Sequence, residues 1–174
     1  MALPRVRRGK AQVHGGAGVN HAEDPSARIE AEFLRVAQVM GELPISNPAL
    51  AVEALGFRPW NGIWVGALLT PWALNLILLP AGNEGFRRLG PDESQVWSFP
   101  SGDYGFWGGP PGALGPYQTC PLISPVHEFA DQADLREAAG AALEALMAEP
   151  QTAAARSAPL RSRRAFLFGR PSAA

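Results

Sequence analysis

Two apolar stretches separated by a short break constrain the fold of this chain more than any other feature. Asn61-Gly62 lies between apolar segments, and this dipeptide is typical of a tight turn between antiparallel strands. We expect the next strand over residues 63–69, a break at Thr70-Pro71-Trp72, and a further strand over residues 73–79. Three strands joined by short turns predict an antiparallel sheet. Shorter strands are expected over residues 95–99, 104–107 and 117–123.

A helix is predicted on each side of this strand-rich region. Asp24 can cap the first helix, Pro25 suits its first turn, and Gly41 can end it. Its apolar residues recur at spacings of three and four, at Ile29, Phe33, Val36, Ala37 and Met40. The second helix is expected over residues 135–147. This order predicts an α+β fold, an antiparallel sheet of about five short strands flanked by an N-terminal and a C-terminal helix, with both helices packed on one face of the sheet.

The chain has 174 residues, which suits one domain with tails. Residues 1–23 are expected to be a disordered N-terminal segment, residues 24–149 a single α+β domain, and residues 150–174 a linker with a basic and apolar C-terminal tail. All 16 acidic residues lie between Glu23 and Glu149, a span that holds only six arginines. Such an acidic body repels the phosphates of nucleic acid and favours basic partners.

Neither a membrane anchor nor a secretory signal is expected. No apolar run reaches the roughly 20 residues that a membrane-spanning helix needs. The basic residues near the start of the chain are followed by a polar, glycine-rich stretch, where a secretory signal would have an apolar segment. The single cysteine, Cys120, excludes an internal disulfide and fits a reducing compartment.

Motifs for nucleophilic catalysis and for phosphate or dinucleotide binding are absent, so no enzymatic activity and no cofactor are expected. His14 and His21 fall in the segment expected to be disordered, which leaves His127 beside Glu128 as a loop histidine. Two alternatives stay open for Cys120. It handles iron or an iron–sulfur cluster, with or without His127, or it is a hydrolase nucleophile paired with His127. A small buried side chain is the simpler interpretation.

Five tryptophans gather in the strand-rich part of the chain, at Trp60, Trp64, Trp72, Trp97 and Trp107. A small sheet covered by two helices cannot easily hide five indoles, each of which carries an N–H group that needs an acceptor. Trp72 falls at a chain reversal and is the tryptophan that we expect to be partly exposed. An apolar groove lined by such residues is suited to a hydrophobic helix or peptide.

Three motifs stand out along the chain, WVGALLTPWALNLILLP at residues 64–80, YQTCPLISP at residues 117–125 and RRAFLFGRPS at residues 163–172. Together they resemble the nickel-iron hydrogenase assembly chaperones of the HybE/HupJ type. The motifs occur in the family's order, and the similarity extends over about residues 29–172.

The resemblance implies an α+β fold, a cytoplasmic location and no enzymatic turnover. It also implies binding to hydrogenase subunit precursors, in particular to that of the small subunit, and leaves open whether that of the large subunit is also bound. The small subunit carries iron–sulfur clusters and a twin-arginine export signal. Some relatives are fused to a rubredoxin domain with paired CxxC iron ligands, a motif that this chain lacks. The family has no catalytic residues to carry over.

The resemblance leads to a hypothesis about mechanism. A twin-arginine signal peptide presents an arginine pair followed by an apolar helix, and an acidic body with an apolar aromatic groove complements both features. Binding would hold an immature subunit back from export and aggregation until its cofactors are in place. We expect partner contacts at Trp64, Thr70, Pro71, Trp72, Asn75, Arg163, Arg164, Phe166 and Phe168.

The C-terminal tail itself contains a pattern similar to a twin-arginine signal. Residues 162–167, Ser-Arg-Arg-Ala-Phe-Leu, match the S-R-R-x-F-L core, although no export function is expected at this position. Two interpretations stay open. The tail is a pseudo-substrate that occupies the groove until a client displaces it, or it is a structural clasp that docks Phe166, Leu167 and Phe168 on the domain.

Overall fold

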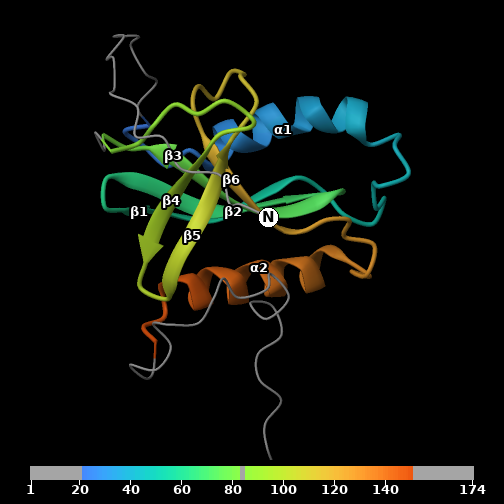
Figure 1. The fold of residues 1–174 in the computed structure, drawn as a ribbon. Helices are drawn as coiled ribbons and strands as arrows, with labels where there is room; N and C mark the ends of the chain where they lie inside the picture. Colours follow the sequence, from blue (N-terminus) through green and yellow to red (C-terminus); the bar gives the residue numbers. More distant parts are fainter. Residues whose placement is uncertain (1–20, 83–84, 151–174) are drawn as a thin grey trace, which may run out of the picture.

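The computed structural model describes residues 21–82 and 85–150, and these ranges contain two helices and six strands (Figure 1). In chain order the elements are α1 (Ser26–Met40), β1 (Glu53–Trp60), β2 (Ile63–Thr70), β3 (Ala73–Pro80), β4 (Ser94–Phe99), β5 (Gly102–Gly108), β6 (Gln118–Ile123) and α2 (Gln132–Met147). The expected α+β fold is confirmed, with six strands in place of about five. Within the described ranges, neither helix has the length and apolar character needed to span a membrane.

The six strands form one antiparallel sheet in the order β1-β2-β3-β6-β5-β4. The turn between β1 and β2 is the predicted Asn61-Gly62, and both residues have positive φ, 47° and 76°. Tight hairpin turns require this backbone conformation, which asparagine and glycine adopt at low cost. β2 and β3 pair without a break from Ile63 opposite Pro80 to Thr70 opposite Ala73, so the predicted central hairpin is also confirmed.

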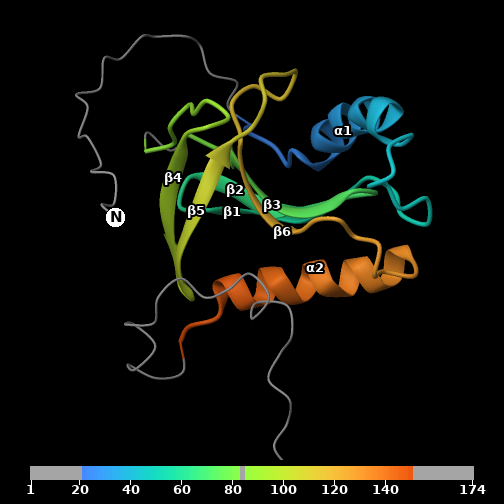
Figure 2. The ribbon, with the colours of Figure 1, turned by 45° about the vertical axis from the view of Figure 1, so that its right-hand side comes forward.

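The two helices lie on opposite faces of the sheet, which corrects the expectation that both pack on one face (Figures 1 and 2). On one face, Ile29 of α1 packs with Leu68 and Ile77. On the other, Leu135 of α2 packs with side chains of the same two strands, such as Val65. β2 and β3 are buried along almost their whole length, so both of their faces need a cover. One helix on each side supplies it.

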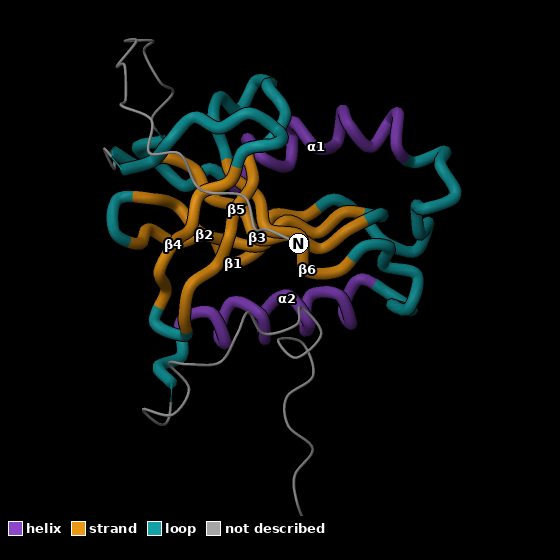
Figure 3. Tube along the Cα trace, viewed as in Figure 1, coloured by secondary structure: helices purple, strands orange, loops and turns teal. Residues whose placement is uncertain are grey.

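The β4–β5 hairpin diverges from the other strands and reaches the C-terminal end of α2 (Figures 2 and 3). β5 pairs with β6 only through Trp107 and Gly108. In the turn between β4 and β5, the amide and the hydroxyl of Ser101 donate to the Leu146 carbonyl, at 3.4 and 2.8 Å. These bonds hold the end of α2 beside the end of the hairpin.

His21 is buried, with 3% of its surface exposed, so the expectation that it belongs to a disordered segment is wrong. Its amide donates to the Pro80 carbonyl at 3.1 Å, and its own carbonyl accepts the Trp64 indole N–H at 2.7 Å. Its ring bonds to the Leu114 carbonyl through Nε2 at 3.2 Å and to Arg28 through Nδ1 at 3.4 Å. His21 thus fastens the start of the described residues to β2, β3, α1 and the loop before β6.

Candidate functional site

The predicted break at Thr70-Pro71-Trp72 is the turn that joins β2 to β3. Thr70 is fully buried, and its hydroxyl donates to the Ala73 carbonyl at 2.9 Å and accepts the Ala73 amide at 3.0 Å. Pro71 and Trp72 at the tip of the turn are half-buried. Thr70 therefore holds the shape of the turn, while Pro71 and Trp72 keep surface available for contacts.

Asn47, in the loop after α1, fastens this turn to two other parts of the chain. Its amide donates to the Pro71 carbonyl at 2.7 Å. Its side-chain amide donates to the carbonyls of Val126 and Phe129, at 3.2 and 2.9 Å. Because Asn47 is buried and bonded to both the β2–β3 turn and the loop before α2, it fixes the position of these two segments relative to each other.

Three loops consequently gather at one end of the molecule, on the right in Figure 1 and again on the right in Figure 2. They are residues 41–50 after α1, the turn at residues 70–73, and residues 124–130 before α2. The hydroxyl of Ser124 adds a further bond, to the Trp72 carbonyl at 3.2 Å. Side chains from distant parts of the sequence thus share one surface.

The C-terminal half of α1 leaves apolar side chains exposed at this end. Ile29 is fully buried, Phe33 is half-buried, and Val39 is 74% exposed. The exposure of the apolar side chains of α1 therefore increases toward its C-terminal end. Of the seven large apolar side chains that are exposed among the described residues, five fall within residues 34–45, at Leu34, Val36, Val39, Leu43 and Ile45. Exposed apolar side chains that gather in this way mark interaction sites.

We define the apolar end surface as Val36, Val39, Leu43, Ile45, Pro71 and Trp72. Val36, Val39 and Leu43 are spaced by three and four residues, which places them along one side of α1 and its continuation. Ile45 follows in the loop that Asn47 ties to the β2–β3 turn. The surface therefore combines a helix end, a loop and a hairpin turn.

The charge around the apolar end surface is negative. Residues 36–50, 70–73 and 124–130 contain Glu42 and Glu128 and no arginine or lysine. The last turn of α1 also has no basic residue, so the partial negative charge at its C-terminal end is not offset from within the helix. An apolar surface with negative charge suits a partner that is both apolar and basic.

The other predicted site residues lie elsewhere. Trp64 is near the opposite end of β2, half-buried, with its indole N–H bonded to His21. Asn75 is half-buried and lies opposite Leu68 on β2, two residues beyond the β2–β3 turn. The tail residues Arg163, Arg164, Phe166 and Phe168 lie outside the described residues.

The structure also shows an exposed tryptophan that sequence reasoning missed. Trp107 is 42% exposed, whereas Trp97 is buried and donates its indole N–H to Gln118 at 2.7 Å, and Trp60 stacks on Phe99 at 4.5 Å between ring centroids. The signal was present in the strand pattern. Phe106 faces the core, so its neighbour Trp107 has to point to the opposite side of the strand.

Cys120 lies in β6, half-buried and packed against the core on the α2 side, opposite Leu76. His127 is exposed in the loop before α2, as expected. In residues 21–82 and 85–150, no group of three or more histidine, cysteine, aspartate or glutamate side chains is placed to hold a metal ion.

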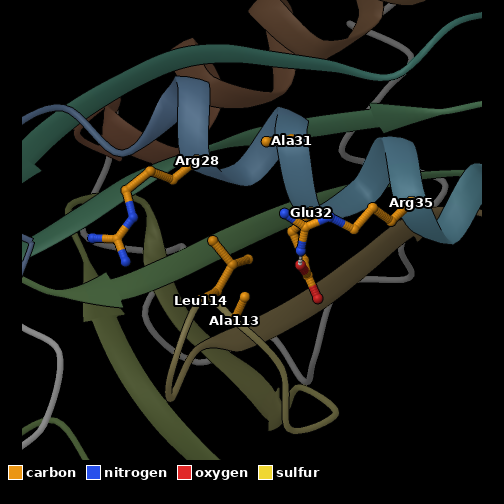
Figure 4. A pocket seen from close by; sticks show the side chains of 6 residues that line it. All are labelled: Arg28, Ala31, Glu32, Arg35, Ala113 and Leu114. Carbon is orange, nitrogen blue, oxygen red and sulfur yellow. Dashed lines mark hydrogen bonds and ion pairs between the residues drawn. The ribbon is translucent and has the colours of Figure 1, made fainter.

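A shallow pocket of about 170 Å³ lies between α1 and the loop before β6 (Figure 4). Its lining residues are Arg28, Ala31, Glu32, Arg35, Ala113 and Leu114. Arg35 reaches back to Glu32 at 2.9 Å, whereas Arg28 points away from that pair and bonds to His21. The charged groups of the pocket are engaged with one another or with the fold, so we assign it no ligand.

Comparison with known proteins identifies the family. The family model described as NiFe-hydrogenase assembly, chaperone, HybE matches residues 24–169. The chain belongs to this family of nickel-iron hydrogenase assembly chaperones. The match includes the β2–β3 turn, the loops of the apolar end surface and most of the C-terminal motif.

Relatives of this chaperone agree with the assignment. The protein HoxT of Cupriavidus necator is 38% identical over 160 residues, which cover 84% of this chain and 89% of HoxT. The hydrogenase expression/formation protein HupJ of Bradyrhizobium diazoefficiens is 40% identical over 137 residues, which cover 76% of this chain and 79% of HupJ. The solution structure of HybE from Escherichia coli has the same fold, with a TM-score of 0.61 at 24% identity, covering 88% of this chain and 94% of HybE.

Proposed function

We propose that this assembly chaperone binds the precursor of a hydrogenase small subunit through its twin-arginine signal peptide, in the cytoplasm, without catalysing a reaction. The apolar end surface is the proposed binding site. Bound there, the signal peptide is withheld from export while the subunit acquires its cofactors. The proposal extends to a large-subunit precursor as a second client of the same surface.

The observation that carries the proposal is the gathering of exposed apolar side chains at the end of α1. Burying such side chains against a partner is favourable by roughly 25 cal/mol per Å² of apolar area removed from water. A helix that lays its apolar face on such a surface contacts it at every third or fourth residue, which matches the spacing of Val36, Val39 and Leu43.

The charges support a client that carries arginines. Glu42 and Glu128 flank the apolar end surface, and the negative end of the α1 dipole lies beside it. An arginine pair next to an apolar helix then meets negative charge at the edge of the surface while the helix covers its centre. Replacing the client's arginines with lysines should weaken this contact, because lysine lacks the planar guanidinium group that bonds to a carboxylate at two points.

Thr70, Asn47 and Asn75 are given supporting roles in this proposal. Thr70 and Asn47 shape the turn and position Pro71 and Trp72, and Asn75 lies on β3, two residues beyond that turn. Trp64 supports the site through the fold, because its indole N–H is bonded to the buried His21.

The test is co-purification of the tagged chaperone with the small-subunit precursor after co-expression. We expect Trp72→Ala, and separately Val39→Ser with Leu43→Ser, to reduce recovery of the precursor while circular dichroism shows a retained fold. Val96→Ser is the control, since Val96 is also an exposed apolar residue but lies on β4. Equal recovery with all variants would exclude the apolar end surface as the binding site.

A further inference from the structure

The two edges of the sheet, β1 and β4, are built differently. β1 carries several features that discourage another strand from pairing with it. Its register shifts between Leu55 and Arg58, Gly56 within that shift has a φ of 65°, and Pro59 lacks an amide donor. Irregularity, proline and charge are the usual protections of an exposed edge.

β4 has none of these protections. Its sequence SQVWSF contains no charge and no proline, and all six residues pair with β5 in regular register. Val96 at its centre is 65% exposed. Among the described residues, β5 is the only strand that pairs with β4. A regular, uncharged edge strand with an exposed apolar side chain is a site where a further strand adds.

The face around Val96 has room for large side chains. Val96 lies opposite Gly105 on β5, and a Cβ atom at Gly105 would meet nothing within 4 Å. Trp107, two residues after Gly105 and therefore on the same face, is 42% exposed. Val96 and Trp107 are the two exposed large apolar side chains, among the described residues, that lie outside residues 34–45.

The last of the described residues lie next to the β4 edge. Ser101, just beyond the end of β4, is bonded to Leu146 in the last turn of α2, and the described residues end four positions later at Pro150. The twelve residues from 151 to 162 span up to about 40 Å when extended. A six-residue strand such as β4 is about 20 Å long, so the segment after residue 162 reaches every position along it.

The sequence of that segment suits the β4 edge. Residues 165–168, Ala-Phe-Leu-Phe, are uninterrupted apolar residues without proline, and two arginines precede them. In a strand, Phe166 and Phe168 share one face. Asp103, exposed and opposite Ser98, supplies negative charge at the end of β4 where the chain approaches. The family model continues well beyond α2, to residue 169, and so includes this segment.

We propose that residues 164–169 pair with β4 as a seventh, antiparallel strand, with Phe166 and Phe168 covering Val96 and Trp107. In an antiparallel pairing, the added strand begins at the C-terminal end of β4, beside the end of α2. This arrangement brings Arg163 and Arg164 near Asp103. The tail is then a clasp that closes the open edge of the sheet. This assignment does not depend on the client, because the apolar end surface lies at the β2–β3 turn, away from β4.

Disulfide trapping in the full chain tests the assignment. In a Cys120→Ser background, Val96→Cys is combined with Phe166→Cys or with Phe168→Cys, and the matched control combines Val39→Cys with the same tail cysteines. Val39 is as exposed as Val96 but belongs to the apolar end surface. We expect a disulfide within the monomer for at least one Val96 pair and none for the Val39 pairs.

Hydrogen exchange gives a second measurement that needs no cysteine. Ala165→Pro removes a backbone donor from the proposed strand, whereas Ala154→Pro changes the linker before it. We expect backbone amides of β4 to exchange at least about tenfold faster in Ala165→Pro than in Ala154→Pro, with the amides of β2 unchanged.

Four results would overturn the assignment. Trapping of the Val39 pairs would place the tail on the apolar end surface as a pseudo-substrate. Trapping only between two chains would make a second copy the occupant of the edge. Absence of trapping in every pair would leave the tail off the domain. Equal exchange of the β4 amides in the two proline variants would exclude strand pairing.

Discussion

At the scale of single residues, His21 shows how one buried side chain fastens the fold. In the neutral ring that fits these contacts, Nε2–H donates to the Leu114 carbonyl and Nδ1 accepts from Arg28. Burial lowers the pKa of His21, and the charge of Arg28 lowers it further, against the opposing effect of the bond to Leu114. A protonated ring would present a second N–H to the Arg28 guanidinium, so burial and the contact with Arg28 favour the neutral form.

This lowered pKa predicts a stability that depends on pH. The unfolded chain takes up a proton on His21 near pH 6.5, whereas the folded chain does so only at lower pH. The free energy of unfolding should therefore be constant above about pH 6.5 as far as His21 is concerned, and should fall as the pH drops from there toward the lowered pKa. Urea denaturation of the wild type and of His21→Gln at several pH values, over a range of about 3 units around the histidine pKa, measures the effect. The same slope in both proteins would contradict the role of His21.

Thr70 carries a second prediction at this scale. Thr70→Val keeps the shape of the side chain but leaves the carbonyl and amide of Ala73 without their buried partner. We expect a loss of ~1–3 kcal/mol in the free energy of unfolding. Thr119→Val on β6, a half-buried position in the same sheet, is the control and should change stability less. Chemical denaturation of the wild type and the two variants measures these free energies of unfolding. An equal loss of stability in both variants would mean that the hydrogen bonds of the turn contribute little.

At the scale of elements, α1 divides into a structural half and an exposed half. Ile29→Ala should lower the free energy of unfolding by ~2–5 kcal/mol, because Ile29 is fully buried against the sheet. Val39→Ser should change it by no more than about 0.5 kcal/mol, because Val39 is mostly exposed. Thermal or urea unfolding of both variants tests the division. A large loss of stability in Val39→Ser would mean that the exposed half of α1 is held by the fold and is less available to a client.

Some of the secondary-structure elements and their arrangement could be predicted from the sequence, and others could not. Asn61-Gly62 and the break at residues 70–72 identified both tight hairpins, because turn residues act through their own backbone preferences. The placement of the helices on opposite faces was missed, although the nearly continuous apolar runs of β2 and β3 already signal burial on both faces. The twisted β4–β5 hairpin and the packing of α2 against its turn depend on tertiary contacts that local patterns do not contain.

Only part of the candidate site could be predicted, because local sequence patterns do not contain the tertiary contacts that assemble it. Trp72 at a chain reversal follows from the local sequence, but its link through Asn47 to the loops at residues 41–50 and 124–130 joins positions far apart in the chain. The exposure of Val39 likewise depends on where α1 leaves the sheet. The predicted apolar stripe of α1 is present, yet only Ile29 along the helix is fully covered.

At the scale of the whole molecule, the surfaces available for contact lie at two ends. The apolar end surface combines α1, the β2–β3 turn and the loop before α2, with acidic residues around it. The β4 edge lies beside the C-terminal end of α2, where the tail departs. This separation predicts that deleting residues 160–174 leaves binding of a signal peptide within about twofold of the full chain, a change of ~0.4 kcal/mol, measured by calorimetry. Tighter binding after deletion would support a pseudo-substrate tail.

Binding of a signal peptide at the apolar end surface is tested by a calorimetric titration of the chaperone with a synthetic signal peptide from a hydrogenase small-subunit precursor. A second peptide with both arginines replaced by lysine and the Val39→Ser, Leu43→Ser variant of the chaperone are measured alongside it. We expect micromolar binding of the first peptide to the wild type, and weaker binding both for the lysine peptide and for the variant. No binding to the wild type, or equal binding in all three titrations, would contradict recognition of the signal peptide at the apolar end surface and would move the client contact to the folded part of the subunit.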